Sequence, residues 1–140
     1  MGRYQAYLNA WEKRVADRVR DRASLRLRAL AAAERAACRI GREFDVRRVI
    51  LYGSLVHEPD RFYEESDIDL AVEGLEPGDF FAAWRLAETE AGGFPVDLTL
   101  LEEVKSWLKE RIIVEGRVLY DIEGCLAYCP AGGGDQANLE

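Results

Sequence analysis

The strongest constraint on the fold is a run of four apolar residues, Val49 to Tyr52, that ends at Gly53. A short continuous apolar run of this kind is typical of a central β-strand that is covered on both faces. In residues 67–72 and 94–100, apolar and polar side chains alternate with the period of two that a strand requires. Residues 118–120 have the pattern of a short last strand. The sequence therefore predicts a sheet of about four strands.

The segment before the sheet has the pattern of a helix. Over residues 4–41, apolar residues recur every three or four positions, as on one face of a helix. The apolar stripe changes face near Leu25, which leaves two alternatives open. The segment is either one long helix or two helices, the second capped by Ser24. Gly41 is expected to end the helical segment.

Glycine and proline residues divide the rest of the chain into shorter helices. Pro59 limits the helix after Ser54 to about one turn, and Pro77 opens a helix that is expected to end near Ala91. A last helix is expected over residues 101–115. Its packed side is predicted to hold Val104, Trp107, Leu108, Ile112 and Ile113. Strands and helices together indicate an α+β fold.

Length and composition suit one packed domain. The chain has 140 residues, 49% of them apolar, which is enough for a single core. We expect a helical arm at residues 1–23, a catalytic domain at residues 24–123 and a flexible tail at residues 124–140.

The chain carries no sign of a membrane or secretory segment. No apolar run approaches the roughly 20 residues that cross a bilayer, and the N-terminus lacks a secretory apolar region. We therefore expect a cytoplasmic protein that makes no membrane contact. The cysteines, Cys38, Cys125 and Cys129, are odd in number and predict reduced thiols rather than a disulfide framework.

Charge is distributed unevenly along the chain. Residues 1–48 hold 13 Lys and Arg against 6 Asp and Glu, whereas residues 49–140 hold 6 against 20. A basic arm on an acidic body is compatible with RNA contact, or with a solvated helix face that complements the body or a partner. We favour the second interpretation and do not expect nucleic-acid binding, because the arm has no RNA-binding motif.

Three aspartates stand in or beside the predicted strands. Asp67 and Asp69 share one face of the second strand, roughly 7 Å apart by strand rise, and Asp97 is on the polar face of the third. If these strands are neighbours, the carboxylates converge and repel one another unless cations share the site. Two Mg²⁺ ions would relieve that repulsion and hold the attacking and leaving oxygens of a displacement. A solvated edge strand is the alternative explanation.

The turn after the first strand offers a place for phosphate. Gly53 lets a phosphate approach the backbone, and Ser54 offers its hydroxyl and nearby N–H groups. Transfer of a nucleotide also needs a base for the acceptor hydroxyl, and Asp97 is the candidate. A Gly-Ser pair alone is ordinary turn chemistry, but the ordered set with the three aspartates indicates nucleotide transfer from a nucleoside triphosphate.

This ordered set carries a family resemblance. The segment Tyr52-Gly53-Ser54, followed by Asp67-Ile68-Asp69-Leu70 and by Asp97 on a later strand, resembles the DNA polymerase β-like nucleotidyltransferase superfamily. It is more closely similar to the minimal nucleotidyltransferase (MNT) proteins, which pair with HEPN-domain proteins in toxin–antitoxin systems. The resemblance spans roughly residues 25–121. It implies a small mixed sheet flanked by helices, with ATP as donor and Mg²⁺ as cofactor.

The same resemblance implies roles for single residues. Gly53 and Ser54 would contact the triphosphate, Asp67 and Asp69 would bind metal, and Asp97 would bind metal and activate the acceptor. His57 stands where the family often has Arg or Lys, so we predict nucleotide contact there, with a surface histidine as the alternative. MNT proteins of this kind are similar to enzymes that attach AMP to a tyrosine of the HEPN toxin.

Three functions stay open after this reading. The first is an antitoxin that transfers AMP, the second is an antitoxin that masks its partner sterically, and the third is a small-molecule nucleotidyltransferase acting as a homodimer. Because about 100 residues form the catalytic module, we expect another protein to present the acceptor. The N-terminal arm is expected to dock to that partner or to a second copy of the chain.

Overall fold

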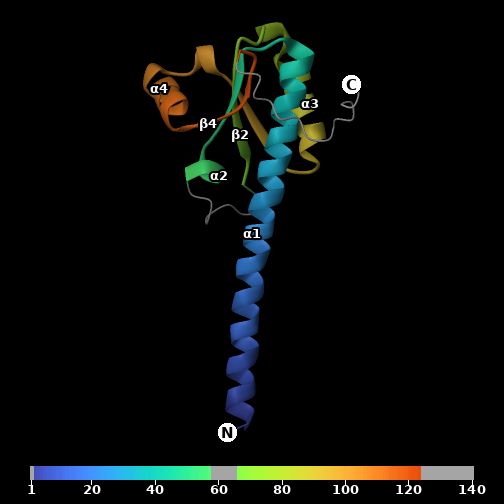
Figure 1. The fold of residues 1–140 in the computed structure, drawn as a ribbon, viewed down its shortest axis with the longest axis vertical. Coiled ribbons are helices and arrows are strands. Elements are labelled where there is room, and N and C mark those ends of the chain that lie inside the picture. The colour runs from blue at the N-terminus through green and yellow to red at the C-terminus, as the bar shows by residue number, and fades with distance from the viewer. Residues whose placement is uncertain (1, 58–65, 124–140) are drawn as a thin grey trace.

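The computed structural model describes residues 2–57 and 66–123 of the chain (Figure 1). The predicted tail, residues 124–140, lies outside these residues. The helices and strands, in chain order, are α1 (Gly2–Phe44), β1 (Arg48–Tyr52), α2 (Ser54–His57), β2 (Ile68–Glu73), α3 (Phe80–Ala91), β3 (Val96–Leu100), α4 (Ser106–Glu115) and β4 (Arg117–Asp121). Short 3₁₀ turns at Pro77–Asp79 and Leu101–Glu103 precede α3 and α4.

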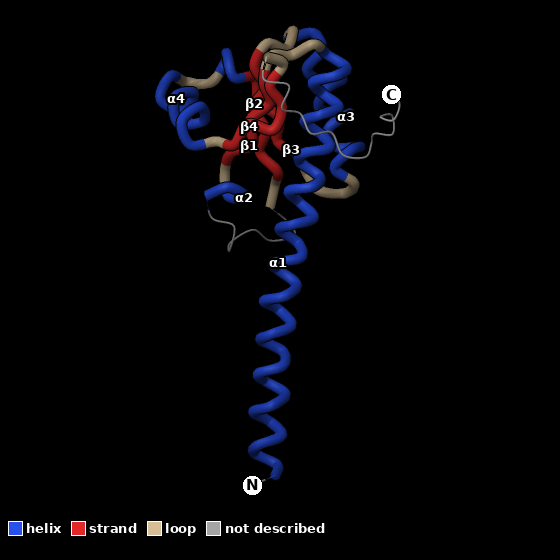
Figure 2. Tube along the Cα trace, viewed as in Figure 1, coloured by secondary structure: helices blue, strands red, loops and turns tan. Residues whose placement is uncertain are grey.

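The strands, drawn in red in Figure 2, form one mixed sheet. Their order in the sheet is β3-β2-β1-β4. The central strand β1 runs antiparallel to both of its neighbours, β2 and β4. β2 and β3 are parallel, because α3 connects them by a crossover. The predicted mixed sheet flanked by helices is confirmed, and β1 is the buried central strand that its apolar run predicts.

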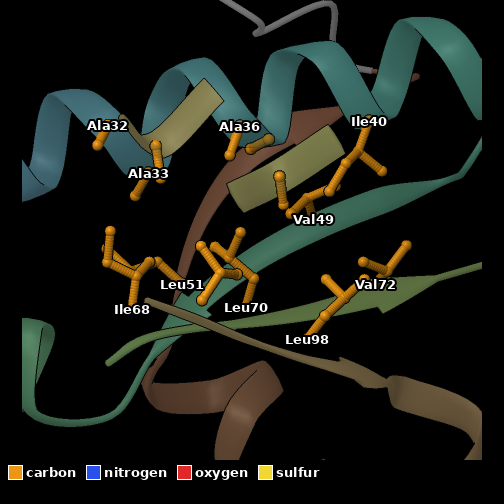
Figure 3. Close-up of a cluster of buried hydrophobic side chains, with 14 of the residues drawn as sticks. Ala32, Ala33, Ala36, Ile40, Val49, Leu51, Ile68, Leu70, Val72 and Leu98 are labelled. Carbon is orange, nitrogen blue, oxygen red and sulfur yellow. The ribbon is translucent and has the colours of Figure 1, made fainter. Parts of the chain in front are cut away.

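Helices cover both faces of this sheet. On one face, α1 and α3 pack against the strands through a large core, and small α1 side chains let the helix approach closely. Figure 3 shows Ala32, Ala33, Ala36 and Ile40 of α1 pointing toward Val49, Leu51 and Leu70 of the sheet. The other face carries a smaller cluster of Ile50, Ala71, Leu101 and Ile112, with side chains of α4 packed against it.

The structure decides between the two alternatives for the N-terminal segment. α1 is one helix of 43 residues, so Ser24 lies within it and caps no second helix. Gly41 does not end the helix, and that prediction is wrong. It lies against the ring of Tyr120, where an added Cβ would overlap the aromatic carbons. The left-handed residue that follows the helix is Asp45, with φ 57°.

The first half of α1 projects away from the sheet (Figure 1). From Arg3 to Ser24 the residues are exposed or half-buried, and the first buried residue is Leu25. Its apolar stripe is open to solvent: Tyr4 is 70% exposed, Trp11 50% and Val19 60%. Among the described helices, none is both long and apolar enough to cross a membrane.

Two further expectations need correction. The helix predicted from Leu101 begins only at Ser106, and Trp107 and Ile113 are exposed rather than packed against the sheet. Leu108 and Ile112, four residues apart, form the line of α4 that packs against the sheet, and Trp107 and Ile113 lie one residue outside it, about 100° around the helix. Cys38 is buried and disulfide-bonded, so the prediction of reduced thiols is wrong for this residue. An odd count excludes complete pairing but not a single bridge.

Candidate active site

The candidate active site lies where three neighbouring strands bring polar residues into one row. Asp69 is the register partner of Tyr52 on β1 and of Asp97 on β3. Ile68 and Leu70 are buried in the core beneath α1 and α3, so the alternation of the strand turns Asp69 toward the opposite face. The predicted approach of Asp97 to the carboxylates of the second strand therefore depends on the parallel pairing of β2 with β3.

Electrostatics confirm that the three carboxylates influence one another. Burial, the Asp97 charge and the Asp67 charge together raise the pKa of Asp69 from 3.8 to about 6. Burial is the largest cause, because a half-buried carboxylate loses part of its hydration. Asp67 and Asp97 are exposed, so Asp69 is the innermost of the three. The site accumulates negative charge and favours a cation.

The glycine turn closes directly over Asp69. Gly53 has φ +86°, a conformation that side chains disfavour, and a Cβ at this position would overlap the carboxylate oxygen Oδ2 of Asp69. The Gly53 carbonyl accepts hydrogen bonds from the N–H groups of Val56 and His57, at 3.1 Å and 2.9 Å. These bonds form the single turn α2, which begins at Ser54 beside the carboxylates. The turn and the aspartates are thus parts of one site.

Tyr52 belongs to this site, although the sequence reading assigned it no role. Its side chain reaches across β2 to β3, where its hydroxyl lies 3.2 Å from Oγ1 of Thr99. Burial raises the pKa of Tyr52, and the charges of Asp69 and Asp97 raise it further. The sequence offered one signal for this role, which is that Tyr52 directly precedes the glycine at the end of the strand. Residues two places apart on a strand share one face, so the position of Tyr52 fixes the face on which its side chain lies.

The candidate ligands suit a magnesium ion whose coordination shell is completed by oxygen atoms of the substrate. All three candidate ligands are carboxylates, the hard oxygen donors that Mg²⁺ prefers, and the charges of Asp67 and Asp97 raise the pKa of Asp69. Within residues 2–57 and 66–123, no three His, Cys, Asp or Glu side chains are arranged as a complete metal-binding group. Mg²⁺ is commonly held by one or two carboxylates together with substrate phosphates, so the residues present fit that mode.

A cavity of about 190 Å³ opens beside the glycine turn, between β1, α2 and α4. It is lined by Tyr52, Gly53, His57, Leu108, Arg111 and Ile112. At its rim Glu115 lies 3.8 Å from His57 and 3.2 Å from Arg111. His57 therefore faces α4, and nothing in the described contacts places it on the aspartates. Arg111 and Glu115 were missed by the sequence reading, because only the tertiary fold brings α4 to this turn.

The family comparison agrees with this geometry. Residues 39–123 match the family described as Polymerase beta, Nucleotidyltransferase. This match covers more than half of the chain, so the chain belongs to the polymerase β nucleotidyltransferase family. The predicted superfamily is confirmed. No curated protein matches the chain significantly.

The solved structures that resemble the fold include two that are described as toxin–antitoxin structures. One, described as a toxin–antitoxin with AMP-PNP, is 26% identical with a TM-score of 0.50, over 63% of this chain and 73% of that one. The other, described as a mutant of the toxin–antitoxin MntA–HpeT, is 24% identical with a TM-score of 0.47, over 59% of this chain and 68% of that one. In both comparisons a large part of this chain lies outside the match.

Proposed function

We propose that the protein is an antitoxin that transfers AMP from ATP to a tyrosine hydroxyl of a HEPN-type toxin. The observation that carries the proposal is the parallel register that sets Asp97 beside Asp69, directly under the Gly53 turn. A chain of the nucleotidyltransferase family that keeps mutually repelling carboxylates at this point has the parts for two-metal catalysis. Likeness to a toxin–antitoxin structure with AMP-PNP supports the partner and the nucleotide.

The proposed step is a single displacement at phosphorus. The tyrosine oxygen attacks the α-phosphorus of ATP and forms a new P–O bond, while the bond from that phosphorus to the oxygen bridging the β-phosphate breaks. Pyrophosphate leaves with the bonding electrons, and the tyrosine proton passes to the carboxylate of Asp97. Gly53 and Ser54 hold the phosphates, with His57 beside them. Two Mg²⁺ ions on Asp67, Asp69 and Asp97 would neutralise the charge that develops on the phosphate oxygens.

The acceptor would come from the partner. The exposed apolar stripe of the arm, which includes Tyr4, Tyr7 and Trp11, is the surface we assign to docking. Docking to a second copy of the chain is the alternative, and it would give a homo-oligomer. We place the reaction in the cytoplasm, where ATP is supplied. Neither nucleic acid nor membrane has a part in it.

A transfer assay tests the proposal directly. The protein is mixed with the product of the neighbouring gene, Mg²⁺ and each nucleoside triphosphate in turn, and the intact mass of the partner is measured. We expect the partner to gain AMP only with ATP and Mg²⁺. Asp67→Asn, Asp69→Asn and Asp97→Asn should abolish the gain, whereas Glu110→Gln on the exposed side of α4 should not. Transfer that survives the aspartate substitutions would refute the metal assignment.

Steric masking is the second candidate, and the exposed arm favours it, because an apolar helix can cover a partner without chemistry. Toxin activity measured in cells separates the two functions. If Asp69→Asn still neutralises the toxin as well as the wild-type chain does, masking is sufficient. If neutralisation is lost while binding persists, transfer is required.

A further inference from the structure

At the rim of the cavity beside Gly53, His57 belongs to an ion cluster whose other two members, Arg111 and Glu115, have no role in the proposed chemistry. Arg111 Nε donates to Oε1 of Glu115 at 3.2 Å, and His57 Nε2 lies 3.8 Å from the same oxygen. The cluster joins α4 to α2, two elements that are separated by much of the chain. The Glu115 carboxylate thus faces the Arg111 guanidinium and the His57 imidazole at the rim of a cavity whose wall includes the glycine turn.

The ion pair is too exposed to be explained by stability. The side chains of Arg111 and Glu115 are 61% and 47% exposed, and an exposed pair four residues apart on a helix contributes little to stability. Among the described residues that line the cavity, Arg111 carries the permanent positive charge, since His57 is charged only when protonated. The guanidinium is therefore available to a ligand that enters the cavity.

The neighbouring groups define which ligand that is. Asp69 lies against Gly53, and the aspartate row repels any anion that arrives without a counter-charge. A phosphate that approaches the turn from the cavity side meets Arg111 and His57 instead. Guanidinium groups bind phosphate through paired hydrogen bonds, which makes Arg a stronger phosphate ligand than a neutral histidine.

We infer that Arg111 is a phosphate-binding residue of the nucleotide site and that Glu115 competes with the phosphate for it. The inference rests on the proposed function, because the phosphate is that of the nucleotide donor. Arg111 supplies from α4 the cation that the short helix α2 lacks, since α2 carries only His57. Before the nucleotide binds, the carboxylate of Glu115 is paired with the guanidinium. When the phosphate arrives, the phosphate displaces that carboxylate.

Opposite effects of the two partners test the inference. Affinity for AMP-PNP with Mg²⁺ and for adenosine is measured by calorimetry on the full chain. Arg111→Gln should weaken AMP-PNP binding roughly ten- to a hundredfold, the loss of charge-assisted hydrogen bonds, and leave adenosine unchanged. Glu115→Gln removes the same ion pair but should tighten AMP-PNP binding about two- to fivefold. Lys109→Gln and Glu110→Gln, exposed on the same helix, are the matched controls.

The other possible results of these measurements contradict different parts of the inference or of the proposed function. Equal losses for both variants, or no change in either, would make the pair structural and sink the inference. Loss of adenosine together with AMP-PNP would show that the cavity takes the base instead of the phosphate. A wild-type chain that binds AMP-PNP through Arg111 but transfers no AMP would overturn the proposed function alone. A wild-type chain that binds no nucleotide would overturn both.

Discussion

At the scale of single residues, the charge of Asp69 lowers the stability of the ligand-free protein, and cation binding is expected to remove this effect. Its raised pKa means that the folded protein releases this proton less readily than the unfolded chain does. Between about pH 4 and pH 6 the unfolded state therefore binds fewer protons, and stability falls as the pH rises through this window. Above about pH 6 the loss of stability has reached its full value and no longer changes with pH.

Replacing this carboxylate should stabilise the protein without ligand. We expect Asp69→Asn to raise the free energy of unfolding at pH 7 by about 1–2 kcal/mol, a value discounted for partial exposure, and to have little effect at pH 4. Urea unfolding at the two pH values measures the difference. Asp21→Asn on the exposed arm is the control. An equal gain at both pH values would assign the effect to packing rather than to charge.

Gly53 is constrained both by its backbone conformation and by its contact with the Asp69 carboxylate. Gly53→Ala should destabilise the fold by about 1–3 kcal/mol, because its φ of +86° is strained for a side chain and the new methyl group displaces the Asp69 carboxylate. Thermal unfolding gives the stability, and AMP-PNP titration gives the effect on the site.

Gly93→Ala separates the two causes. Gly93 also has a positive φ, of +109°, but an added Cβ there meets nothing within 4 Å. This control should lose stability and keep nucleotide affinity. If Gly53→Ala behaves like Gly93→Ala in both measurements, the turn has no special relation to Asp69.

At the scale of elements, close packing of α1 on the sheet holds the strands that carry the site. Ala29, Ala32, Ala33, Ala36 and Ala37 are fully buried against it. Ala36→Leu should cost about 1–3 kcal/mol, because the extra carbons have no space at this approach. Ala23→Leu, exposed on the same helix, should be nearly neutral. Urea unfolding compares the variants, and similar stability for both would show that the helix can shift.

The sheet shows which features of the elements can be predicted from the sequence. The alternation of apolar and polar residues predicts β2 and β3 within a few residues, because one face must be buried, and the continuous apolar run predicts β1. The same alternation predicts that Asp97 and Asp69 face away from the core. It does not predict that β2 and β3 are parallel partners, which follows from the path of α3 across the sheet.

At the scale of the whole molecule, the arm and the body are expected to act separately. Removing residues 1–22 should weaken capture of the partner while leaving nucleotide affinity and thermal stability unchanged, since burial begins only at Leu25. Pull-down of the toxin and AMP-PNP titration measure the two properties. Pull-down that is unaffected by the truncation would remove the arm from the interface. A change in molecular mass in solution would instead assign the arm to a second copy of the chain.

The sequence by itself determined the strands, the glycine turn, the three aspartates and the family, because these are set by local patterning and by the order of residues along the chain. Only the tertiary structure decided that α1 is a single helix, that Asp97 pairs in register with Asp69, and that Arg111 and Glu115 of α4 meet His57. The physical reason is that periodicity reports which face of an element is buried. The choice of neighbour depends on how distant elements share one core.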